Sequence, residues 1–379
     1  MTVPPPVVVL EARALSGPAG GVVRYIRGLL DGFAQLHPPF PLTVICDHPR
    51  GCAAVRDVPS IAVPPSASWL RPYWDRVALP RAIRRLRPQL VHLTKPIGVP
   101  RRGFPPTVTT IYDVIPLTHP DTQTVAQRTY WRFALPAAAR SAAAIVTISE
   151  ASKRAIVETL GVAEDRITVT YPGIEPVFVP ATPDACAAFR ERLALGATPY
   201  VLTVGTIEPR KNVDRLLTAF ARLTGDIPHT LVIAGRWGWK TDRVVEAARD
   251  PRLNGRVRFL GRVGEEDLPA LYSGADAFAF LSQDEGFGFP PLEAMACGTP
   301  VLVSTLGSLP EVVGSAALLV NPEDEEGVAD ALRRLLSETA LRTRLTAEGQ
   351  EQVRKFTWER TARQTRAVYE RVLRHSLDQ

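Results

Sequence analysis

Short apolar segments alternate with amphipathic segments along the whole chain. The apolar segments are rich in β-branched residues, which is typical of strands buried on both faces of a parallel sheet. Strands are predicted at 7–10, 42–46, 89–93, 107–111, 144–148, 167–170, 200–204, 230–234, 256–260, 276–281, 300–303 and 317–320. Helices are predicted at 21–36, 74–86, 124–141, 150–160, 211–223, 241–249, 265–273, 290–297, 324–336, 339–353 and 357–374. Because strands and helices alternate, the pattern predicts parallel sheets with helices on both faces.

A proline-rich stretch at 176–183 (PVFVPATP) interrupts this alternation, which then starts again. A chain of 379 residues also exceeds the length of one typical domain. The sequence therefore predicts two doubly wound α/β domains, at 1–185 and 190–356, with a linker near 180–195. Ligands bind such sheets beyond the carboxyl ends of the strands, so the residues that follow each strand are the candidates for function.

Composition limits the class of protein further. The chain is 45% hydrophobic and 22% charged, as in ordinary globular proteins. Its cysteines, Cys46, Cys52, Cys186 and Cys297, include no C-x-x-C pair, which argues against a zinc site or a disulfide framework and indicates a reducing compartment. No apolar run reaches the roughly 18 residues of a membrane span, and the N-terminal segment lacks the features of a signal peptide. We therefore expect a cytoplasmic protein.

The net charge is +6, and arginines are concentrated at 81–88 (RAIRRLRP). This basic run has two interpretations. It attracts phosphate-bearing ligands or an anionic membrane surface, which would make the protein peripherally membrane-associated, or it is a solvated helix face. There is no zinc-finger pattern and no basic strand with interleaved aromatic residues, so nucleic acid is not an expected partner.

The most informative loop is DEGFGFPPLEAMACGTPV at 284–301, which follows a predicted strand. Gly286 and Gly288 allow backbone amides to approach a ligand closely. Two prolines then suit a helix start, and Glu293 is expected in the first turn of that helix. The pattern predicts a strand–loop–helix site for an anionic ligand, with Glu285 and Glu293 at its two ends. The alternative is an exposed Glu285 beside an ordinary acidic helix start.

Two further loops have related features. Residues 205–212 (GTIEPRKN) follow a strand and place Arg210 and Lys211 at a helix N-terminus, where the helix dipole disfavours cations unless they bind an anion. Gly20 and Gly21 lie between the first strand and the first helix, a signal that a turn alone explains. Together, the three loops predict an anionic ligand in a cleft between the two domains.

These loops belong to a larger set of motifs that runs along nearly the whole chain. The set consists of GG-x-x-RY at 20–25, YDVIPLTHP at 112–120, VTISEASK at 146–153, YPGI at 171–174, VGTIEPRKN at 204–212, LVIAGRWGW at 231–239, LGRVGEEDLPALYSGADAF at 260–278 and Glu-x7-Glu at 285–293. In this combination the chain resembles the retaining glycosyltransferases of family 4. Within that family it is most similar to the mannosyltransferases of O-antigen and exopolysaccharide assembly.

The resemblance implies a GT-B fold, in which two Rossmann-like domains face a cleft and the second domain holds most of a nucleotide-sugar. It also implies that the last helix, at about 357–379, packs back on the N-terminal domain. The implied reaction moves a hexose, most directly mannose from GDP-mannose, to a glycan or a lipid-linked saccharide with retention of configuration. A UDP-linked donor is the alternative. No cofactor and no metal are expected, and no D-x-D pair follows a predicted strand.

The resemblance also implies residue roles, position by position. Catalytic roles fall to Glu285, which matches the glutamate that contacts the donor sugar, and to Lys211 at the pyrophosphate, with Arg210 beside it. Glu293 matches the glutamate that binds the ribose hydroxyls. The other donor-binding positions are the backbone amides of Gly286, Phe287, Gly288 and Phe289, the loop residues Gly205 and Thr206, the glycines Gly20 and Gly21, and, beside the nucleobase, Arg262 and Val263. The acceptor side is assigned to Tyr112, Asp113 and Ser149, and the 66–76 segment with Trp69, Tyr73 and Trp74 belongs either to that surface or to the core.

Two positions depart from the family pattern. Family members commonly have an arginine where this chain has Thr206, and Arg210 is expected to supply that charge from another direction. Many relatives have a histidine where this chain has Tyr112. A tyrosine can donate a hydrogen bond but cannot carry a proton at neutral pH as histidine does, so we assign no acid–base role to Tyr112.

The Tyr112 substitution leaves one alternative function open, a catalytically weak or inactive GT-B scaffold that binds nucleotide-sugars or glycans. A dinucleotide oxidoreductase would need G-x-G-x-x-G after a strand, and neither half of the chain has it. A retaining glycosidase would need two carboxyl groups about 5–5.5 Å apart on one bond, whereas Glu293 fits a hydroxyl acceptor. An enzyme that hydrolyses or epimerises the nucleotide-sugar without an acceptor is a further alternative.

Overall fold

The computed structural model describes residues 8–17, 20–37, 41–46, 60–62, 77, 79–99, 104–192 and 195–377. The chain divides into two compact units. Unit 1 comprises Met1–Gly173 and Phe356–Gln379, and unit 2 comprises Ile174–Lys355. The segment 66–76, with its three aromatic candidates for the acceptor surface, lies outside the described residues.

Unit 1 contains a seven-stranded sheet in the order β3-β2-β1-β4-β5-β6-β7. Its strands are β1 Val8–Glu11, β2 Leu42–Cys46, β3 Ser60–Ala62, β4 Leu90–Leu93, β5 Thr107–Thr110, β6 Ala144–Thr147 and β7 Ile167–Val169. All neighbouring strands in this order are parallel, as the buried apolar runs predict. Only β3 was not predicted, because a strand of 3 residues is too short to give a recognisable pattern.

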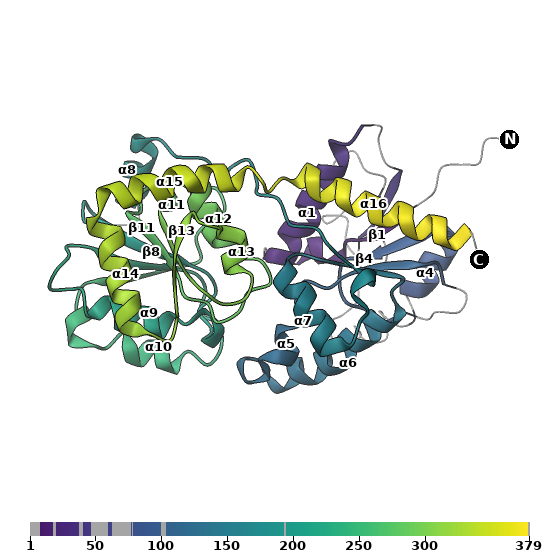
Figure 1. Cartoon of the computed structure of the whole chain (residues 1–379), viewed down its shortest axis with the longest axis horizontal. Coiled ribbons are helices and arrows are strands. Elements are labelled where there is room, and N and C mark those ends of the chain that lie inside the picture. Colours follow the sequence, from purple (N-terminus) through teal and green to yellow (C-terminus); the bar gives the residue numbers. More distant parts are fainter. Residues whose placement is uncertain are drawn as a thin grey trace. The chain divides into compact units, whose positions relative to one another are not determined.

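Helices lie on both sides of this sheet (Figure 1). They are α1 Gly21–Ala34, α4 Leu79–Leu86, α5 Ile115–Thr118, α6 Val125–Ser141, α7 Glu150–Leu160 and α16 Trp358–Leu377. Helices α1 and α16 pack against each other, and the Tyr369 hydroxyl of α16 lies 2.6 Å from Nδ1 of His92 in β4. Helices α6 and α7 contribute Leu135 and Ile156 to a separate hydrophobic cluster.

Trp358 anchors α16 in unit 1. A Cβ atom on Gly28 of α1 would lie 2.0 Å from Cε2 of Trp358, and a Cβ atom on Gly173 would lie 2.2 Å from the Trp358 backbone nitrogen. The last helix can therefore dock here only because both positions lack side chains. One turn further along, the Thr361 hydroxyl donates to the carbonyl of Tyr171 (2.6 Å). The two segments of unit 1 are thus joined close to the points where the chain leaves it.

Unit 2 contains a six-stranded parallel sheet in the order β10-β9-β8-β11-β12-β13. Its strands are β8 Tyr200–Val204, β9 Thr230–Ala234, β10 Val257–Gly261, β11 Ala277–Phe280, β12 Val301–Ser304 and β13 Ala317–Val320. Its helices are α8 Pro183–Arg192, α9 Val213–Ala221, α10 Asp242–Ala247, α11 Leu268–Ser273, α12 Phe289–Ala296, α13 Leu309–Val313, α14 Glu325–Ser337 and α15 Thr339–Val353. One hydrophobic cluster joins the sheet to α9 and α14, and a second joins it to α11 and α12. Both units are thus doubly wound α/β structures, as predicted.

The boundary between the units differs from the predicted linker. The chain enters unit 2 at Ile174, and the predicted linker near 180–195 contains helix α8 instead. Phe178 (4% exposed) and Phe189 (3% exposed) pack in a core cluster of unit 2 with Tyr272. The proline-rich stretch was therefore a misleading signal, because it contains the buried Phe178 and leads directly into α8, both of which belong to the second unit.

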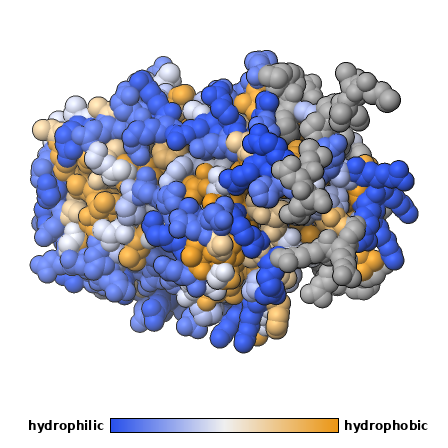
Figure 2. All heavy atoms as spheres, turned by 45° about the vertical axis from the view of Figure 1, so that its right-hand side comes forward, coloured by the Kyte–Doolittle hydropathy of each residue, from blue (hydrophilic) through white to orange (hydrophobic). Residues whose placement is uncertain are grey.

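The surface in view is mostly hydrophilic, with hydrophobic atoms in smaller groups between the charged side chains (Figure 2). No helix within the described part of the chain combines the length and the apolar character that a membrane span requires. The sheet of unit 2 brings the carboxyl ends of β8 and β11 together, because these strands are parallel neighbours. The loops that follow them carry most of the predicted donor-site residues.

Candidate active site

The loop after β8 begins with a close approach of two backbone segments. A Cβ atom on Gly235, which follows β9, would lie 1.8 Å from the carbonyl oxygen of Gly205, so only glycine fits at position 235. The amide of Ile207 then donates to the carbonyl of Arg236 (2.9 Å), and the amide of Gly238 donates to the carbonyl of Ile207 (2.9 Å). These contacts fix the course of the loop before it reaches its charged residues.

Arg210 and Lys211 lie next to a helix N-terminus, as predicted, but just before the helix and not within it. They lie in a 3-10 turn at Pro209–Lys211, and α9 begins only at Val213. Asn212 separates the two elements in the left-handed conformation (φ 56°), and its side-chain amide donates to the carbonyl of Pro322 (3.1 Å). This turn directs both cations toward the loop after β11.

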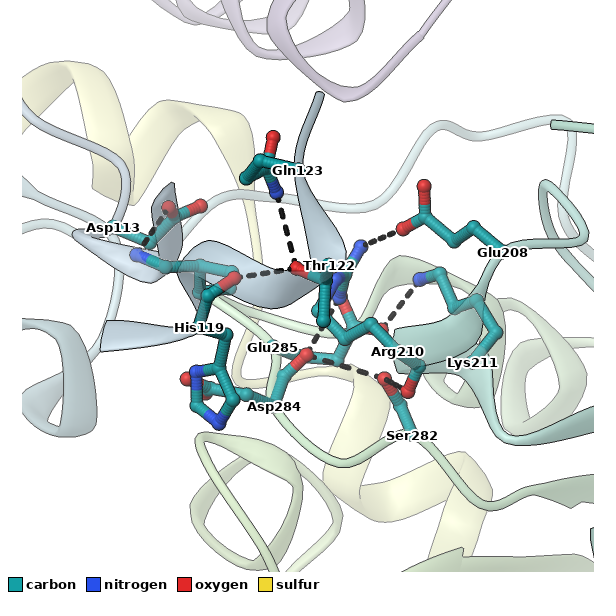
Figure 3. Close-up of polar contacts among 11 residues, drawn as sticks. Asp113, His119, Thr122, Gln123, Glu208, Arg210, Lys211, Ser282, Asp284 and Glu285 are labelled. Atoms are coloured by element: carbon teal, nitrogen blue, oxygen red, sulfur yellow. Dashed lines mark hydrogen bonds and ion pairs between the residues drawn. The ribbon is translucent and has the colours of Figure 1, made fainter. Parts of the chain in front are cut away.

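Four charged side chains meet between these two loops, all of them from unit 2 (Figure 3). The Lys211 ammonium lies 2.5 Å from Oε1 of Glu285, and Nη1 of Arg210 lies 2.9 Å from Oε2 of the same carboxylate. Nη2 of Arg210 binds Oε1 of Glu208 at 2.7 Å. Their side chains are only 9–15% exposed. The structure therefore brings together all three residues that the sequence predicts as catalytic.

Backbone contacts hold the two loops in register. The guanidinium of Arg210 donates to the carbonyl of Asp284 (2.6 Å), and the amide of Gln283 donates to the carbonyl of Arg210 (2.8 Å). The Ser282 hydroxyl lies within hydrogen-bonding distance of the Arg210 and Asp284 carbonyls, at 3.2 and 3.1 Å. Sequence reasoning missed Ser282 and Glu208, although both are polar residues that follow predicted strands.

The electrostatics of the cluster keep Glu285 ionised. Burial alone would raise the pKa of this carboxyl, but the charges of Arg210 and Lys211, with a hydrogen bond from Lys211, lower it to about 2. Burial lowers the pKa of Lys211, and the Glu285 carboxylate opposes that shift. The two partners differ because the carboxylate faces two cations, whereas the ammonium has a carboxylate on one side and the Arg210 guanidinium nearby. Glu285 is therefore an acceptor of hydrogen bonds and not a proton donor at neutral pH.

A third loop, after β12, supports the Glu285 loop and was not predicted. Gly307 has φ 62°, and a Cβ atom there would lie 2.8 Å from the Glu285 amide nitrogen. Next to it, the Ser308 hydroxyl donates to the carbonyl of Phe287 (2.8 Å), and the Ser308 amide donates to the carbonyl of Glu285 (3.3 Å). The sequence feature that could have indicated this loop is the run of small and polar residues directly after the predicted strand at 300–303.

Glu293 is placed differently from the prediction. Helix α12 begins at Phe289, so Glu293 lies more than one turn inside it and not in its first turn. The residue is only 1% exposed, and Oε2 accepts a hydrogen bond from the Tyr272 hydroxyl (2.7 Å). Gly288 caps the helix, and Phe287 and Phe289 contact each other edge to face (5.1 Å between ring centres). The ribose contact of Glu293 stays a prediction, and Tyr272 is a partner that the sequence did not indicate.

The predicted nucleobase residues follow β10 at the same edge of the unit-2 sheet. Arg262 is exposed, and Val263 is partly buried against the hydrophobic cluster that contains Tyr272. Thr206 lies in the loop after β8 and is half-buried. Within the described residues, no hydrogen bond or ion pair joins these three residues to the charged cluster, so their roles stay predictions.

The predicted residues of unit 1 lie at the carboxyl ends of its strands. Gly20 is the N-cap of α1, and a Cβ atom there would meet nothing within 4 Å, while Gly21 is the first residue of the helix. The Asp113 carboxylate accepts the Ile115 amide (3.1 Å) at the start of α5 (Figure 3). The Ser149 hydroxyl is 0% exposed and accepts the Ser152 amide (2.9 Å) as the N-cap of α7. The hydroxyl thus already serves as a helix cap, and the acceptor contact of Ser149 stays a prediction.

Tyr112 turns its hydroxyl into unit 1. The oxygen is buried and has no hydrogen-bond partner among the described residues. The ring packs edge to face on Tyr25, with 5.2 Å between ring centres. Burial raises the pKa of Tyr112 well above its usual value, and Tyr25 and Glu11 add to that rise. The hydroxyl is therefore neutral at physiological pH, in agreement with our assigning it no acid–base role.

A buried ion pair near Tyr112 was not predicted. Glu11 ends β1 and is 0% exposed, and Nε of Arg13 (8% exposed) lies 2.6 Å from its Oε1. The Thr94 hydroxyl, which follows the neighbouring strand β4, donates to the Glu11 carbonyl (2.6 Å). The sequence feature that could have indicated this ion pair is a glutamate at the end of an apolar strand pattern. Within the described residues, no group of three or more histidine, cysteine or acidic side chains is placed to hold a metal ion.

Comparison with known proteins identifies the family. Residues 19–178 match the family described as Glycosyltransferase Family 4, and residues 187–352 match the family described as Glycosyl transferases group 1. The O-antigen chain mannosyltransferase B of Escherichia coli is 35% identical over 264 residues, which cover 69% of each chain. The chain belongs to glycosyltransferase family 4.

Other relatives of this glycosyltransferase match over shorter shares of their length. The O-antigen chain mannosyltransferase RfbU of Salmonella typhimurium is 30% identical over 226 residues, which cover 60% of each chain. The serotype-specific mannosyltransferase WbdA of Escherichia coli is 29% identical over 289 residues, which are 74% of this chain but only 35% of that relative.

Solved structures show the same fold as this glycosyltransferase. The sucrose-phosphate synthase of Thermosynechococcus elongatus superposes with a TM-score of 0.77 at 23% identity, over 98% of this chain and 100% of that one. The Anabaena protein HepE, solved in complex with UDP and glucose, superposes with a TM-score of 0.75 at 19% identity, over 96% of this chain and 99% of that one. The two units together therefore have the GT-B fold that the resemblance implied.

Proposed function

We propose that this glycosyltransferase moves a hexose, most directly mannose from GDP-mannose, to a glycan or a lipid-linked saccharide with retention of configuration. The observation that carries the proposal is the buried Glu285–Lys211–Arg210 cluster at the carboxyl ends of β8 and β11. The names of its relatives, which are O-antigen and serotype-specific mannosyltransferases, support the choice of mannose. The Anabaena relative solved with UDP-glucose supports a nucleotide-sugar as donor.

Lys211 and Arg210 would stabilise the diphosphate that leaves when the sugar–phosphate bond breaks. Charge that develops on a leaving group is stabilised best by cations already held in place, and both side chains here are fixed by Glu285 and the loop carbonyls. The cluster of two cations with Glu285 and Glu208 is electrically balanced, so a diphosphate must share Lys211 with Glu285. The Lys211 ammonium has three N–H donors, so it can bind the diphosphate and keep its ion pair with Glu285.

Glu285 would bind the hydroxyls of the donor sugar. Its low pKa keeps it a carboxylate, which accepts hydrogen bonds but cannot protonate a leaving group. This protonation state argues against a glycosidase, whose general acid needs a raised pKa. The Glu293 carboxylate would accept hydrogen bonds from the ribose hydroxyls in addition to the one from Tyr272. Arg262 and Val263 would border the base.

The acceptor would lie on unit 1, near Tyr112 and Asp113. We infer a cytoplasmic enzyme that meets a lipid-linked acceptor at the membrane surface. The arginines at 81, 84, 85 and 87 are exposed on and just after α4, as required for either membrane contact or a solvated face. The alternative of an inactive scaffold rests on the Tyr112 substitution alone, and the relatives, which are named as mannosyltransferases, give it no support.

A donor screen tests the proposal. Calorimetry with GDP-mannose, GDP and UDP-glucose should give one preferred nucleotide, and incubation with donor and an O-antigen acceptor extract should release the matching nucleoside diphosphate. EDTA should leave this release unchanged if Lys211 and Arg210 bind the diphosphate without a metal, as we propose. Donor binding without release across all acceptors would support the scaffold. A strict Mg²⁺ requirement would contradict the metal-free mechanism.

A further inference from the structure

Trp237 lies in the loop between β9 and α10 of unit 2, and its side chain is exposed. The residue is 45% exposed, whereas the other tryptophans within the described ranges, Trp131, Trp239 and Trp358, are partly or fully buried. Exposure of a single apolar side chain is ordinary in a folded protein. What distinguishes Trp237 is that its backbone and its ring are both held in place.

The backbone is fixed on both sides of Trp237. Trp237 pairs with Ile207 in a parallel bridge beyond the ends of β8 and β9. The Ile207 amide donates to the Arg236 carbonyl, and the Gly238 amide donates to the Ile207 carbonyl, both at 2.9 Å. A Cβ atom on Gly238 would lie 2.7 Å from that carbonyl oxygen, so a side chain there would push the two segments apart. Because Ile207 is 1% exposed within the core of unit 2, the bridge ties Trp237 to a rigid part of the unit.

A second aromatic ring supports the indole. The Phe259 ring of β10 lies 5.0 Å from that of Trp237 between ring centres, with an angle of 30° between the planes. Phe259 in turn packs against the hydrophobic cluster that contains Ile207. The indole is thus fixed in orientation while nearly half of the residue stays open to solvent. An aromatic side chain that is already held loses little conformational entropy when it binds a ligand.

The loop of Trp237 adjoins the loop that carries the two cations. Gly235 approaches the carbonyl of Gly205 so closely that only glycine fits there. Ile207, the bridge partner of Trp237, precedes Lys211 in the same 205–212 loop. A ligand on the indole would therefore lie at the carboxyl edge of the unit-2 sheet, next to the loop that carries the cations.

The nucleoside positions are supported from the other face of this sheet. Val263, assigned to the base, packs against the cluster with α11 and α12, which also contains Tyr272, the partner of the ribose-binding glutamate. Ile207 and Phe259 pack in the cluster with α9 and α14. Alternate residues of β9 enter the two clusters, which therefore lie on opposite faces of the sheet. The side of Trp237 thus favours a ligand other than the nucleoside of the donor.

We propose that Trp237 stacks on a pyranose ring of a mannose-containing acceptor glycan. The C–H groups on one face of a pyranose form an apolar surface that an indole can cover, while the hydroxyls around its rim need polar partners. Arg236, exposed in the same loop, offers N–H donors for such hydroxyls. The proposal rests on the proposed function, which supplies the class of acceptor. The hexose of the donor is the other source of such a ring, and the test separates the two.

Titration of the full chain with an α-linked mannotetraose tests the proposal without donor or turnover. Wild type should bind this saccharide in calorimetry, and its tryptophan fluorescence should shift to shorter wavelength as the sugar covers the exposed indole. Trp237→Ala should raise the Kd about tenfold and abolish the shift, because one aromatic anchor is lost. Trp237→Phe should keep most of the affinity but not the shift. The control is Val245→Ser, at an apolar residue of α10 that is 40% exposed, and it should match wild type.

Transfer kinetics identify the source of the ring. With GDP-mannose and a mannose-terminated acceptor, Trp237→Ala should raise the acceptor KM about tenfold, while kcat and the calorimetric Kd of GDP-mannose stay unchanged. A raised Kd of GDP-mannose with unchanged mannotetraose binding would assign the indole to the donor hexose and overturn the proposal. Wild type that does not bind mannotetraose, or that binds it no better than Trp237→Ala, would overturn it as well. Binding through Trp237 without any release of GDP from GDP-mannose would support the stacking and contradict the proposed function.

Discussion

At Glu285, burial and neighbouring charges shift the pKa of the carboxyl group in opposite directions. The two cations dominate, so the carboxylate is ionised although its side chain is only 11% exposed. The sequence predicted this residue from its loop, but not the pairing itself, because Lys211 is 74 residues away along the chain. Only the parallel pairing of β8 and β11 brings them together.

The depressed pKa of Glu285 predicts an acid-labile unit 2. A carboxyl group whose folded pKa is lowered from 4.5 to about 2 contributes stability above its unfolded pKa, on the order of 3 kcal/mol, and loses it as the pH falls through the folded pKa. As the pH falls between these two pKa values, the free energy of urea unfolding should therefore decrease more steeply for wild type than for Glu285→Gln. Parallel pH profiles of the two proteins would contradict the pairing.

Lys211 gives a prediction about ligand binding. Lys211→Ala should weaken GDP binding about 10- to 100-fold, the contribution of a charge-assisted hydrogen bond, while guanosine binding stays nearly unchanged. Calorimetry with both ligands checks this, and Lys355→Ala, an exposed lysine of unit 2, serves as the control. If guanosine and GDP lose affinity equally, Lys211 does not bind the phosphates.

Other residues show where sequence reasoning ends. Glu293 was expected in a first turn, but the helix starts four residues before it and buries it against Tyr272. Ser149 sits in a motif of the family, yet its hydroxyl caps α7. In both cases the pattern identified the residue type and the element, whereas burial depends on side chains from other elements.

At the scale of elements, strands were predicted well because each is a nearly continuous apolar run between helices. Helices α5, α8 and α13 were missed. The helix α8 follows prolines that indicated a linker, and α5 and α13 have only 4 and 5 residues. The loop after β12 was missed as well, although Gly307 and Ser308 support the Glu285 loop directly. Loops that support a site carry no charge signal of their own.

The Gly307 contact predicts the effect of adding a single methyl group. Gly307→Ala places a Cβ atom 2.8 Å from the Glu285 amide nitrogen in a left-handed conformation, so the Glu285 loop must shift. We expect kcat to fall about 10- to 100-fold, because small displacements of a catalytic group are costly, and stability to fall by about 1–3 kcal/mol. Gly225→Ala, where a Cβ atom meets nothing within 4 Å, should change neither. Equal turnover in the two variants would show that the loop after β12 does not position Glu285.

At the scale of the whole molecule, unit 1 is built from both ends of the chain. Helix α16 is the last element, but it packs on α1, and Tyr369 joins His92 and Thr110 in a buried hydrogen-bonded group. Burial lowers the pKa of His92 to about 3, so this group is uncharged at neutral pH. The sequence alone shows an amphipathic last helix; its docking on unit 1 was implied only by the family resemblance.

Trp358 provides the test of this arrangement. Trp358→Ala should lower the stability of unit 1 by about 3–5 kcal/mol, because it empties a glycine-lined slot in the core. Hydrogen exchange of α1 amides and urea unfolding would report the loss. Trp237→Ala, at a tryptophan that is 45% exposed in unit 2, should cost less than about 1 kcal/mol. The docking account fails if the two substitutions have the same effect.

The central claim is that the Glu285–Lys211–Arg210 cluster acts on a nucleotide-sugar. The most direct test compares sugar transfer from GDP-mannose and donor affinity in wild type, Glu285→Gln and the exposed control Glu246→Gln. We predict that Glu285→Gln lowers kcat by about 10²- to 10³-fold, as expected for the loss of a preorganised electrostatic group, while the donor Kd changes little and the control matches wild type. Turnover of Glu285→Gln close to that of wild type would contradict the claim.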